Sequence, residues 1–175
     1  PVAGSIELGN SFIEMVRPFV YRRYIDFSAI EEIKSMKERI DLSLLRRSPD
    51  TIDVKLGAGG IREVEFFCQA LQLIHCGKNA DIRERHTLTA LEKLREKGLV
   101  KDDEASRLAE WYIFLRNLEH RIQIVEGRQS QAIPAKEAEL ERLARMMGFS
   151  DSDGKKAAQF FWEEYRKKTS AIHEI

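Results

Sequence analysis

The chain has 175 residues, of which 43% are hydrophobic and 33% are charged. Lysine plus arginine and aspartate plus glutamate each total 29, so the net charge of zero argues against a dedicated surface for nucleic acid or for an anionic membrane. No apolar run has the length of a membrane span, no stretch has the pattern of a secretory signal, and the length suffices for one hydrophobic core.

Helical spacing of apolar residues begins near the start of the chain. It predicts one helix within residues 6–26 and a second one that begins at Ser28. The segment Ser48-Pro49-Asp50 breaks this pattern, and residues 51–56 are expected to be extended. The next periodic stretch predicts a helix over residues 60–77.

The second half of the chain continues in the same way. We expect a short helix over residues 87–97, ended by Gly98, and a long helix from Asp102 or Asp103 to Gly127. Residues 135–147 and residues 154–175 complete the pattern. Because strand signals are nearly absent, the sequence predicts an all-α fold, a multi-helix bundle of about seven helices, in a single domain over residues 1–175.

Two features bear on where the protein works. Cys68 and Cys76 lie eight residues apart on one predicted helix, about 12 Å along its axis, which is too far for a disulfide. We therefore expect free core cysteines in a reducing cytosol and a cytoplasmic protein. The chain begins without a methionine and stops inside a helical pattern, so we expect it to be a piece cut from a longer protein.

The segment that points most strongly to a function precedes the helix at residues 60–77. Gly57, Gly59 and Gly60 stand between Lys55 and Arg62. Glycines permit a close approach, and the start of a helix presents unpaired N–H groups and the positive end of its dipole. This pattern predicts a phosphate-facing loop with added positive charge from the lysine and the arginine. It fits neither the P-loop nor the G-x-G-x-x-G fingerprint.

The loop also has a purely structural interpretation, as a tight turn where helices pack closely. Arg62 and Glu65 lie three positions apart, so Glu65 either contacts a ligand with Arg62 or forms a surface pair with it. Glu63 and Glu65 point to different faces of a helix and make a poor metal pair. Both interpretations of the loop remain open at this point.

Other candidates have ordinary explanations. Asp151 and Asp153 lack the remaining ligands of a calcium loop, and we expect a cap for the last helix there. The four histidines lack metal-ligand spacing, so no metal site is expected in this chain. The run Glu119-His120-Arg121 lies on the long helix, where we expect a solvated face.

The loop and its continuation, Asp53-x-Lys55-Leu-Gly57-x-Gly59-Gly60-Ile-Arg62-Glu63-Val-Glu65-Phe66, resemble the glutamine synthetase adenylyltransferase/deadenylylase family. Further segments resemble that family in the same order. They are Pro1-Val-Ala-Gly4, Tyr21-Arg-Arg-Tyr24-Ile-Asp26, Phe114-Leu-Arg116-x-Leu-Glu119-His120-Arg121-x-Gln123 and Gln129-x-Gln131-x-x-Pro134.

The resemblance implies a helical domain that follows a nucleotidyltransferase domain, with residues 1–5 as the tail of that upstream domain. Members of the family attach AMP to glutamine synthetase or remove it by phosphorolysis, under the control of the signalling protein PII and glutamine. The resemblance thus implies a role in nitrogen metabolism, use of Mg²⁺ and ATP or ADP in the parent enzyme, and the upstream domain, glutamine synthetase and PII as partners. The Arg62 form of the loop resembles the deadenylylating, N-terminal half.

The family's catalytic motif is a Gly-Ser followed closely by Asp-x-Asp, whose carboxylates hold Mg²⁺. Here Gly4-Ser5 stands alone, and Asp151 and Asp153 form the chain's one Asp-x-Asp near its other end. We therefore expect no catalytic residue and no metal ligand in this chain, and no activity from it alone.

Within this resemblance, Lys55, Gly57, Gly59, Gly60, Arg62 and Glu65 are the residues expected to face a phosphate or nucleotide in the neighbouring active site. Two alternatives remain open: a module that docks glutamine synthetase or PII through other surfaces, and the homologous domain of PII uridylyltransferase, which shares the Lys-x-Gly-x-Gly-Gly-x-Arg core. The continuation Glu65-Phe66-x-x-Gln69 favours the adenylyltransferase.

Overall fold

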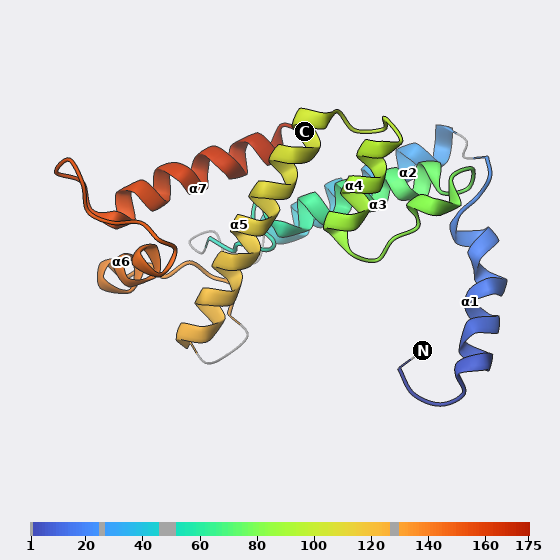
Figure 1. The fold of residues 1–175 in the computed structure, drawn as a ribbon, viewed down its shortest axis with the longest axis horizontal. Helices are drawn as coiled ribbons and strands as arrows, with labels where there is room; N and C mark the ends of the chain where they lie inside the picture. Colours follow the sequence, from blue (N-terminus) through green and yellow to red (C-terminus); the bar gives the residue numbers. More distant parts are fainter. Residues whose placement is uncertain (1, 25–26, 46–51, 127–129) are drawn as a thin grey trace.

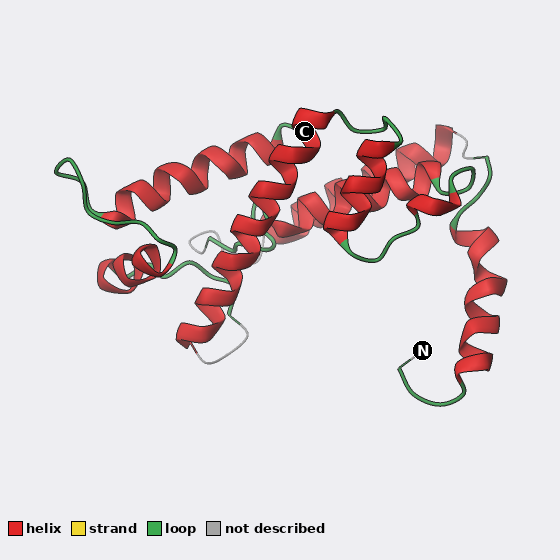
Figure 2. Cartoon of the chain, viewed as in Figure 1, coloured by secondary structure: helices red, strands yellow, loops and turns green. Residues whose placement is uncertain are grey.

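The computed structural model describes residues 2–24, 27–45, 52–126 and 130–175. Within these ranges the chain forms seven α-helices, one short 3₁₀ helix and no strand, so the predicted all-α class is confirmed (Figures 1 and 2). Some predicted features lie outside the described residues: Pro1, Ile25, Asp26 and Gln129 of the motifs above, the break at Ser48-Pro49-Asp50, and Gly127 at the end of the long helix. The helices are α1 (Ile6–Val20), α2 (Phe27–Leu45), α3 (Ile61–His75), η1 (Ala80–Ile82), α4 (Thr87–Glu96), α5 (Asp102–Glu126), α6 (Glu137–Met146) and α7 (Ala157–His173).

The core forms where α3, α4, α5 and α7 pack against one another, with α6 against α5 and α7. Apolar side chains at helical spacing meet there because each helix has an apolar face. The largest fully buried side chains include Ile61, Val64, Leu91, Leu94, Leu108, Leu115, Leu118, Ile122, Leu143 and Phe161.

Helix α5 crosses the middle of the molecule and contacts α3, α4, α6 and α7 (Figure 1). Its 25 residues begin with three acids, Asp102, Asp103 and Glu104, which favour the positive end of the helix dipole. The long helix predicted over this range is therefore confirmed, and it is the element on which the candidate site is built.

Helix α1 stands apart from this core at the opposite side from α6 and α7 (Figure 1). It has an apolar face, yet none of its residues is buried. The exposed apolar residues on α1 are Ile6, Leu8, Phe12, Ile13, Met15, Phe19 and Val20. Within the described residues, no helix combines the length and apolar character needed to cross a membrane.

Residues 51–56 were expected to be extended, but among the described residues 52–56 only Asp53 takes part in a bridge. Asp53 pairs with Ala132 in an isolated antiparallel bridge. Backbone hydrogen bonds from Val54 N to Gln131 O (2.9 Å) and from Ile133 N to Ile52 O (2.9 Å) flank it. After Val54 the chain turns, because the Asp53 carboxylate accepts hydrogen bonds from the backbone N–H groups of Lys55 and Leu56.

Candidate functional site

The loop between residues 53 and 60 is built by Asp53. One carboxylate oxygen, Oδ1, accepts hydrogen bonds from the backbone N–H groups of Lys55 and Leu56, both at 2.8 Å. The Asp53 carbonyl accepts a third bond from Gly57 N, at 2.8 Å. An aspartate that binds the backbone two and three residues ahead fixes a tight turn. The position of Lys55 is therefore set by local sequence.

The N–H groups that begin α3 are occupied by this same loop. Ile61 N donates to Val54 O at 3.1 Å, Arg62 N to Lys55 O at 3.0 Å, and Glu63 N to Gly60 O at 3.1 Å. The expectation that the helix start presents unpaired N–H donors is wrong for these three groups. An anion at this loop would have to be bound by side chains.

The glycines have close backbone neighbours. Gly59 is buried with a φ of +67°, and a Cβ built on it would lie much closer than 3.0 Å to the backbone of Thr169 in α7. A Cβ on Gly60 would lie under 3.0 Å from the carbonyl oxygens of Val54, Lys55 and Gly57. Packing therefore accounts for glycine at positions 59 and 60.

Lys55 is held toward a buried carboxylate on α5. Its Nζ lies 3.8 Å from Glu119 Oε1, while Arg116 Nη1 lies 2.9 Å from Glu119 Oε2. Gln131 Nε2 donates to Glu119 Oε1 at 3.3 Å. Glu119 is only 3% exposed, so the prediction that it belongs to a solvated face is wrong. Its two cationic neighbours provide the compensation that a buried charge requires.

Arg62 and Glu65 do not form the ion pair considered from their spacing. Glu65 Oε1 instead accepts a hydrogen bond from Tyr112 Oη on α5, at 3.3 Å. The pKa of Tyr112 is raised, mainly by burial and also by the nearby negative charge of Glu65. Arg62 is exposed, and its guanidinium has no hydrogen bond or ion pair to any residue in the described part of the chain.

Glu63 forms a junction that the sequence did not reveal. Its carboxylate accepts the Gly59 N–H at 2.6 Å and lies 3.0 Å from Nδ1 of His173 in α7 and 3.3 Å from Nζ of Lys37 in α2. Burial raises the pKa of Glu63, but the Gly59 N–H, His173 and Lys37 together outweigh it and lower the pKa. Glu63 and Glu65 thus serve different faces of α3, as expected.

The remaining candidates have structural roles. Asp151 Oδ1 accepts the N–H of Ala157 at 2.9 Å and so caps α7, as expected. Cys68 and Cys76 are buried and free. In the described ranges, no three His, Cys, Asp or Glu side chains are grouped to hold a metal ion.

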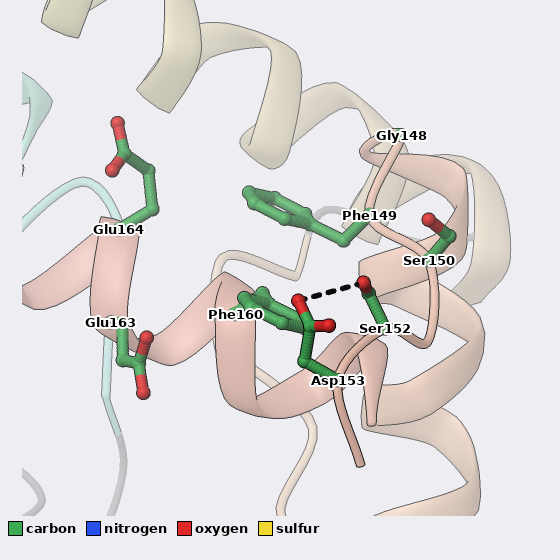
Figure 3. A pocket seen from close by; sticks show the side chains of 8 residues that line it. All are labelled: Gly148, Phe149, Ser150, Ser152, Asp153, Phe160, Glu163 and Glu164. Carbon is green, nitrogen blue, oxygen red and sulfur yellow. Dashed lines mark hydrogen bonds between the residues drawn. The ribbon is translucent and has the colours of Figure 1, made fainter. Parts of the chain in front are cut away.

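A shallow, open pocket of about 410 Å³ lies between the loop after α6 and the first turns of α7 (Figure 3). Asp153 and Glu163 line it, and Ser152 Oγ donates to Asp153 Oδ2 at 3.1 Å. None of the predicted site residues lies in this pocket. Its acids would disfavour a phosphate, and we do not assign it to the anion site.

Comparison with known proteins agrees with the resemblance drawn from the motifs. The family model described as GlnD PII-uridylyltransferase matches residues 31–175. The chain is 44% identical over 157 residues to a bifunctional glutamine synthetase adenylyltransferase/adenylyl-removing enzyme of Stenotrophomonas maltophilia, with 90% of the chain and 17% of that protein covered. Enzymes of the same name from Hahella chejuensis (45% over 148 residues, 85% of the chain, 15% of the relative) and Rhizobium meliloti (43% over 157 residues, 87% and 16%) are similar to it.

The chain spans less than a fifth of the length of these relatives, 15–17% of each. The similarity therefore concerns one segment of a much larger enzyme. Since the family model covers most of the chain, this protein belongs to the family described as GlnD PII-uridylyltransferase, and it resembles one segment of the bifunctional glutamine synthetase adenylyltransferase/adenylyl-removing enzymes.

Proposed function

We propose that this chain is a helical accessory domain of an enzyme that adenylylates and deadenylylates glutamine synthetase. The support is 42–46% identity to curated enzymes of that name over 85–90% of the chain. In this proposal the parent works in the cytoplasm with Mg²⁺ and ATP or ADP, and the carboxylates that hold the metal lie outside these 175 residues. Its partners are an upstream nucleotidyltransferase domain, glutamine synthetase and PII.

Within the parent, the loop at residues 53–60 borders the neighbouring active site and faces phosphate. The observation that carries this assignment is the relation between Lys55 and Arg62. Their backbones are joined by the bond from Arg62 N to Lys55 O, at 3.0 Å, yet Arg62 is exposed and the Lys55 side chain is 31% exposed. Two cations are thus presented by a rigid loop whose glycines are packed inside. Gly57, Gly59 and Gly60 form the turn between these two cations, and Glu65, one turn after Arg62, faces the same site in this proposal.

The domain belongs to the deadenylylating half of the parent in this proposal, because the Gly-Gly-Ile-Arg62 form of the loop resembles that half. The isolated chain is inactive. Nucleotidyl transfer depends on metal ions that neutralise developing charge, and the described residues offer no group of three carboxylate, thiol or imidazole side chains to hold one.

A second candidate function is an interaction module, in which the glycine loop serves only packing. Two observations favour it. Gly59 and Gly60 are explained by close backbone contacts, and α1 leaves Phe12, Met15 and Phe19 exposed on an unpartnered face. Exposed apolar patches of this kind mark contacts with other protein surfaces. In the first proposal, the surface that covers the apolar face of α1 is that of the upstream nucleotidyltransferase domain.

A third candidate is the corresponding domain of a PII uridylyltransferase, which the description of the matching family model favours. Assay of the full-length enzyme on glutamine synthetase and on PII distinguishes the two substrates. Transfer of UMP to PII, without any reaction on glutamine synthetase, would replace the first proposal with this one.

The experiment that separates catalysis from docking changes both cations at once. In the full-length enzyme, Lys55→Gln with Arg62→Gln should abolish most deadenylylation of adenylylated glutamine synthetase while the affinity for glutamine synthetase stays unchanged. Arg142→Gln is the matched control, because Arg142 is exposed on α6. Loss of affinity together with unchanged turnover of the bound complex would support the interaction module instead.

A further inference from the structure

Glu119 is a buried carboxylate at the base of the glycine loop, and it connects three separate parts of the chain. It lies on α5, receives Arg116 from one turn earlier on the same helix, and draws in Lys55 from the loop and Gln131 from the segment after α5. The backbone of Gln131 also accepts the Val54 N–H, at 2.9 Å. Gln131 therefore links Glu119 to the loop: its side chain binds Glu119, and its backbone binds Val54, next to Lys55.

The contact between Glu119 and Lys55 is electrostatic without being a hydrogen bond. The distance from Lys55 Nζ to Glu119 Oε1 is 3.8 Å, beyond the range in which an N–H donates. Arg116, at 2.9 Å, satisfies the other oxygen. In the described part of the chain, the ammonium of Lys55 is thus oriented by the carboxylate while its three N–H donors stay available.

Two cations share this carboxylate, and neither is fully buried. One buried acid, Glu119, faces two cations, and both keep about a third of their side chains exposed, 31% for Lys55 and 36% for Arg116. Arg116, at 2.9 Å, and the Gln131 amide, at 3.3 Å, bind Glu119 directly, as a buried carboxylate requires. Lys55 lies farther away, at 3.8 Å, and the exposed parts of both cations face solvent.

Arg62 is related to this site through the contact between α3 and α5. Glu65 of α3 contacts Tyr112, early in α5, whereas Lys55, before α3, lies by Glu119, later in α5. Along α5, the contact with Glu65 therefore lies nearer the start of the helix than the contact with Lys55. Arg62 stands one turn before Glu65 on α3, and Arg116 stands one turn after Tyr112 on α5. Helical spacing therefore puts each arginine on the side of its helix that carries the Glu65–Tyr112 contact.

We propose that Glu119 is a positioning residue that organises Lys55 and Arg116, together with Arg62, into one three-cation site for the phosphoryl oxygens of inorganic phosphate or of a nucleotide. The inference rests on the proposed function and extends it. It adds Arg116 as a third ligand-binding cation, and it assigns to Glu119 and Gln131 the task of holding Lys55 in place.

Removal of the Glu119 charge separates this proposal from simple electrostatics. If Glu119 were only a nearby negative charge, Glu119→Gln would strengthen anion binding because it removes a repulsive group. If Glu119 positions the cations, the same change weakens binding. The matched control is Glu96→Gln, which removes one negative charge from an exposed position on α4.

The 175-residue chain would be titrated at low ionic strength with inorganic phosphate and, separately, with ADP, by calorimetry and by amide chemical shifts. Thermal unfolding of each variant would be recorded alongside. We expect saturable binding, a roughly tenfold weaker Kd for Glu119→Gln and for Arg116→Gln, and a Kd within about threefold of the parent for Arg116→Lys. Glu96→Gln should bind as tightly as the parent or slightly more tightly. The tighter of the two ligands identifies the source of the phosphoryl group.

The absence of saturable binding by the unchanged chain would overturn the inference, as would a Glu119→Gln variant that binds as tightly as the parent or more tightly. If Glu119→Gln is unfolded at the assay temperature, Arg116→Gln and Arg116→Lys decide. Failure of the proposed function has a different outcome. The three-cation site would bind phosphate as described, while Arg116→Gln in the full-length enzyme left deadenylylation unchanged.

Discussion

Gly59 and Thr169 join the glycine loop to the last helix by direct backbone contact. The Thr169 carbonyl packs directly on the α-carbon of Gly59. A Cβ added to Gly59 would lie far closer than 3.0 Å to the carbonyl oxygen. The loop is thereby fixed against α7, 110 residues after Gly59 along the chain. This contact makes the loop a rigid support for Lys55 and Arg62.

Gly59→Ala is therefore expected to destabilise the domain strongly. The substitution introduces both a strained backbone, since φ is +67°, and a clash with the Thr169 backbone that only a shift of α7 relieves. We expect a loss of about 3 kcal/mol or more in the free energy of unfolding, measured by denaturant titration. Gly98→Ala is the matched control, because Gly98 has a φ of +68° with no atom near the added Cβ. It should cost only about 1–2 kcal/mol, and equal losses for the two variants would contradict the packing role.

Glu63 should make stability dependent on acid pH. Its folded-state pKa lies below the ordinary pKa of a glutamate, so its carboxylate stabilises the fold above that ordinary pKa and loses this contribution as the pH falls through the folded pKa. Glu63→Gln is expected to cost about 1–2 kcal/mol at pH 7, and the difference from the parent should shrink below about pH 4.

Thermal unfolding of the two proteins between pH 3 and pH 7 measures this difference. Glu14→Gln serves as the control, since Glu14 forms only a surface pair with Arg17 on α1 and should change stability little. A constant difference between the Glu63→Gln variant and the parent over this pH range would rule out the junction with Gly59, His173 and Lys37.

The two cysteines should be unreactive in the folded protein. Burial raises the pKa of Cys68 to about 12 and that of Cys76 to about 11, and the thiolate is the reactive form. An aromatic disulfide reagent at pH 8 should release almost no chromophore from the native chain and two equivalents after denaturation. Rapid reaction of one equivalent in the native state would show that one thiol is accessible.

The isolated chain should neither adenylylate nor deadenylylate glutamine synthetase. The assays are incubation with glutamine synthetase, ATP and Mg²⁺, and incubation of the adenylylated form with phosphate. Among the described residues, no three carboxylate, thiol or imidazole side chains are grouped to hold the metal that stabilises developing charge, so turnover should equal the background. Turnover that survives repurification and follows the chain through a gel-filtration column would contradict this expectation.

The sequence predicted the helices well because their signals are local. The acids at Asp102 and Asp103 and the apolar spacing after them give the start of α5 and its length. Gly98 and Gly148, both at positive φ, mark the ends of α4 and α6 because glycine adopts this conformation without a Cβ penalty. Extended backbone at residues 51–56 was overestimated, since Asp53 accepts from the N–H groups of Lys55 and Leu56 and turns the chain.

The candidate site was less predictable because its partners come from distant parts of the chain. Glu119 adjoins Leu115 and Leu118 on the buried side of α5, and a charged residue there is expected in solvent unless its compensating cations are known. One of those cations, Lys55, is supplied by the loop before α3. Likewise, only the folded loop reveals that Val54 O and Lys55 O accept the first N–H groups of α3.

The most direct test of the central claim is Arg62→Ala in the full-length enzyme, with deadenylylation rate and thermal stability measured on the same preparation. Arg62 is exposed, so its removal leaves no core cavity. A charge-assisted hydrogen bond to phosphate contributes about 1.5–3 kcal/mol. The account predicts a roughly tenfold to hundredfold loss of deadenylylation with an unchanged Tm, whereas full activity in the folded variant, or unfolding with full activity in the surviving fraction, would contradict it.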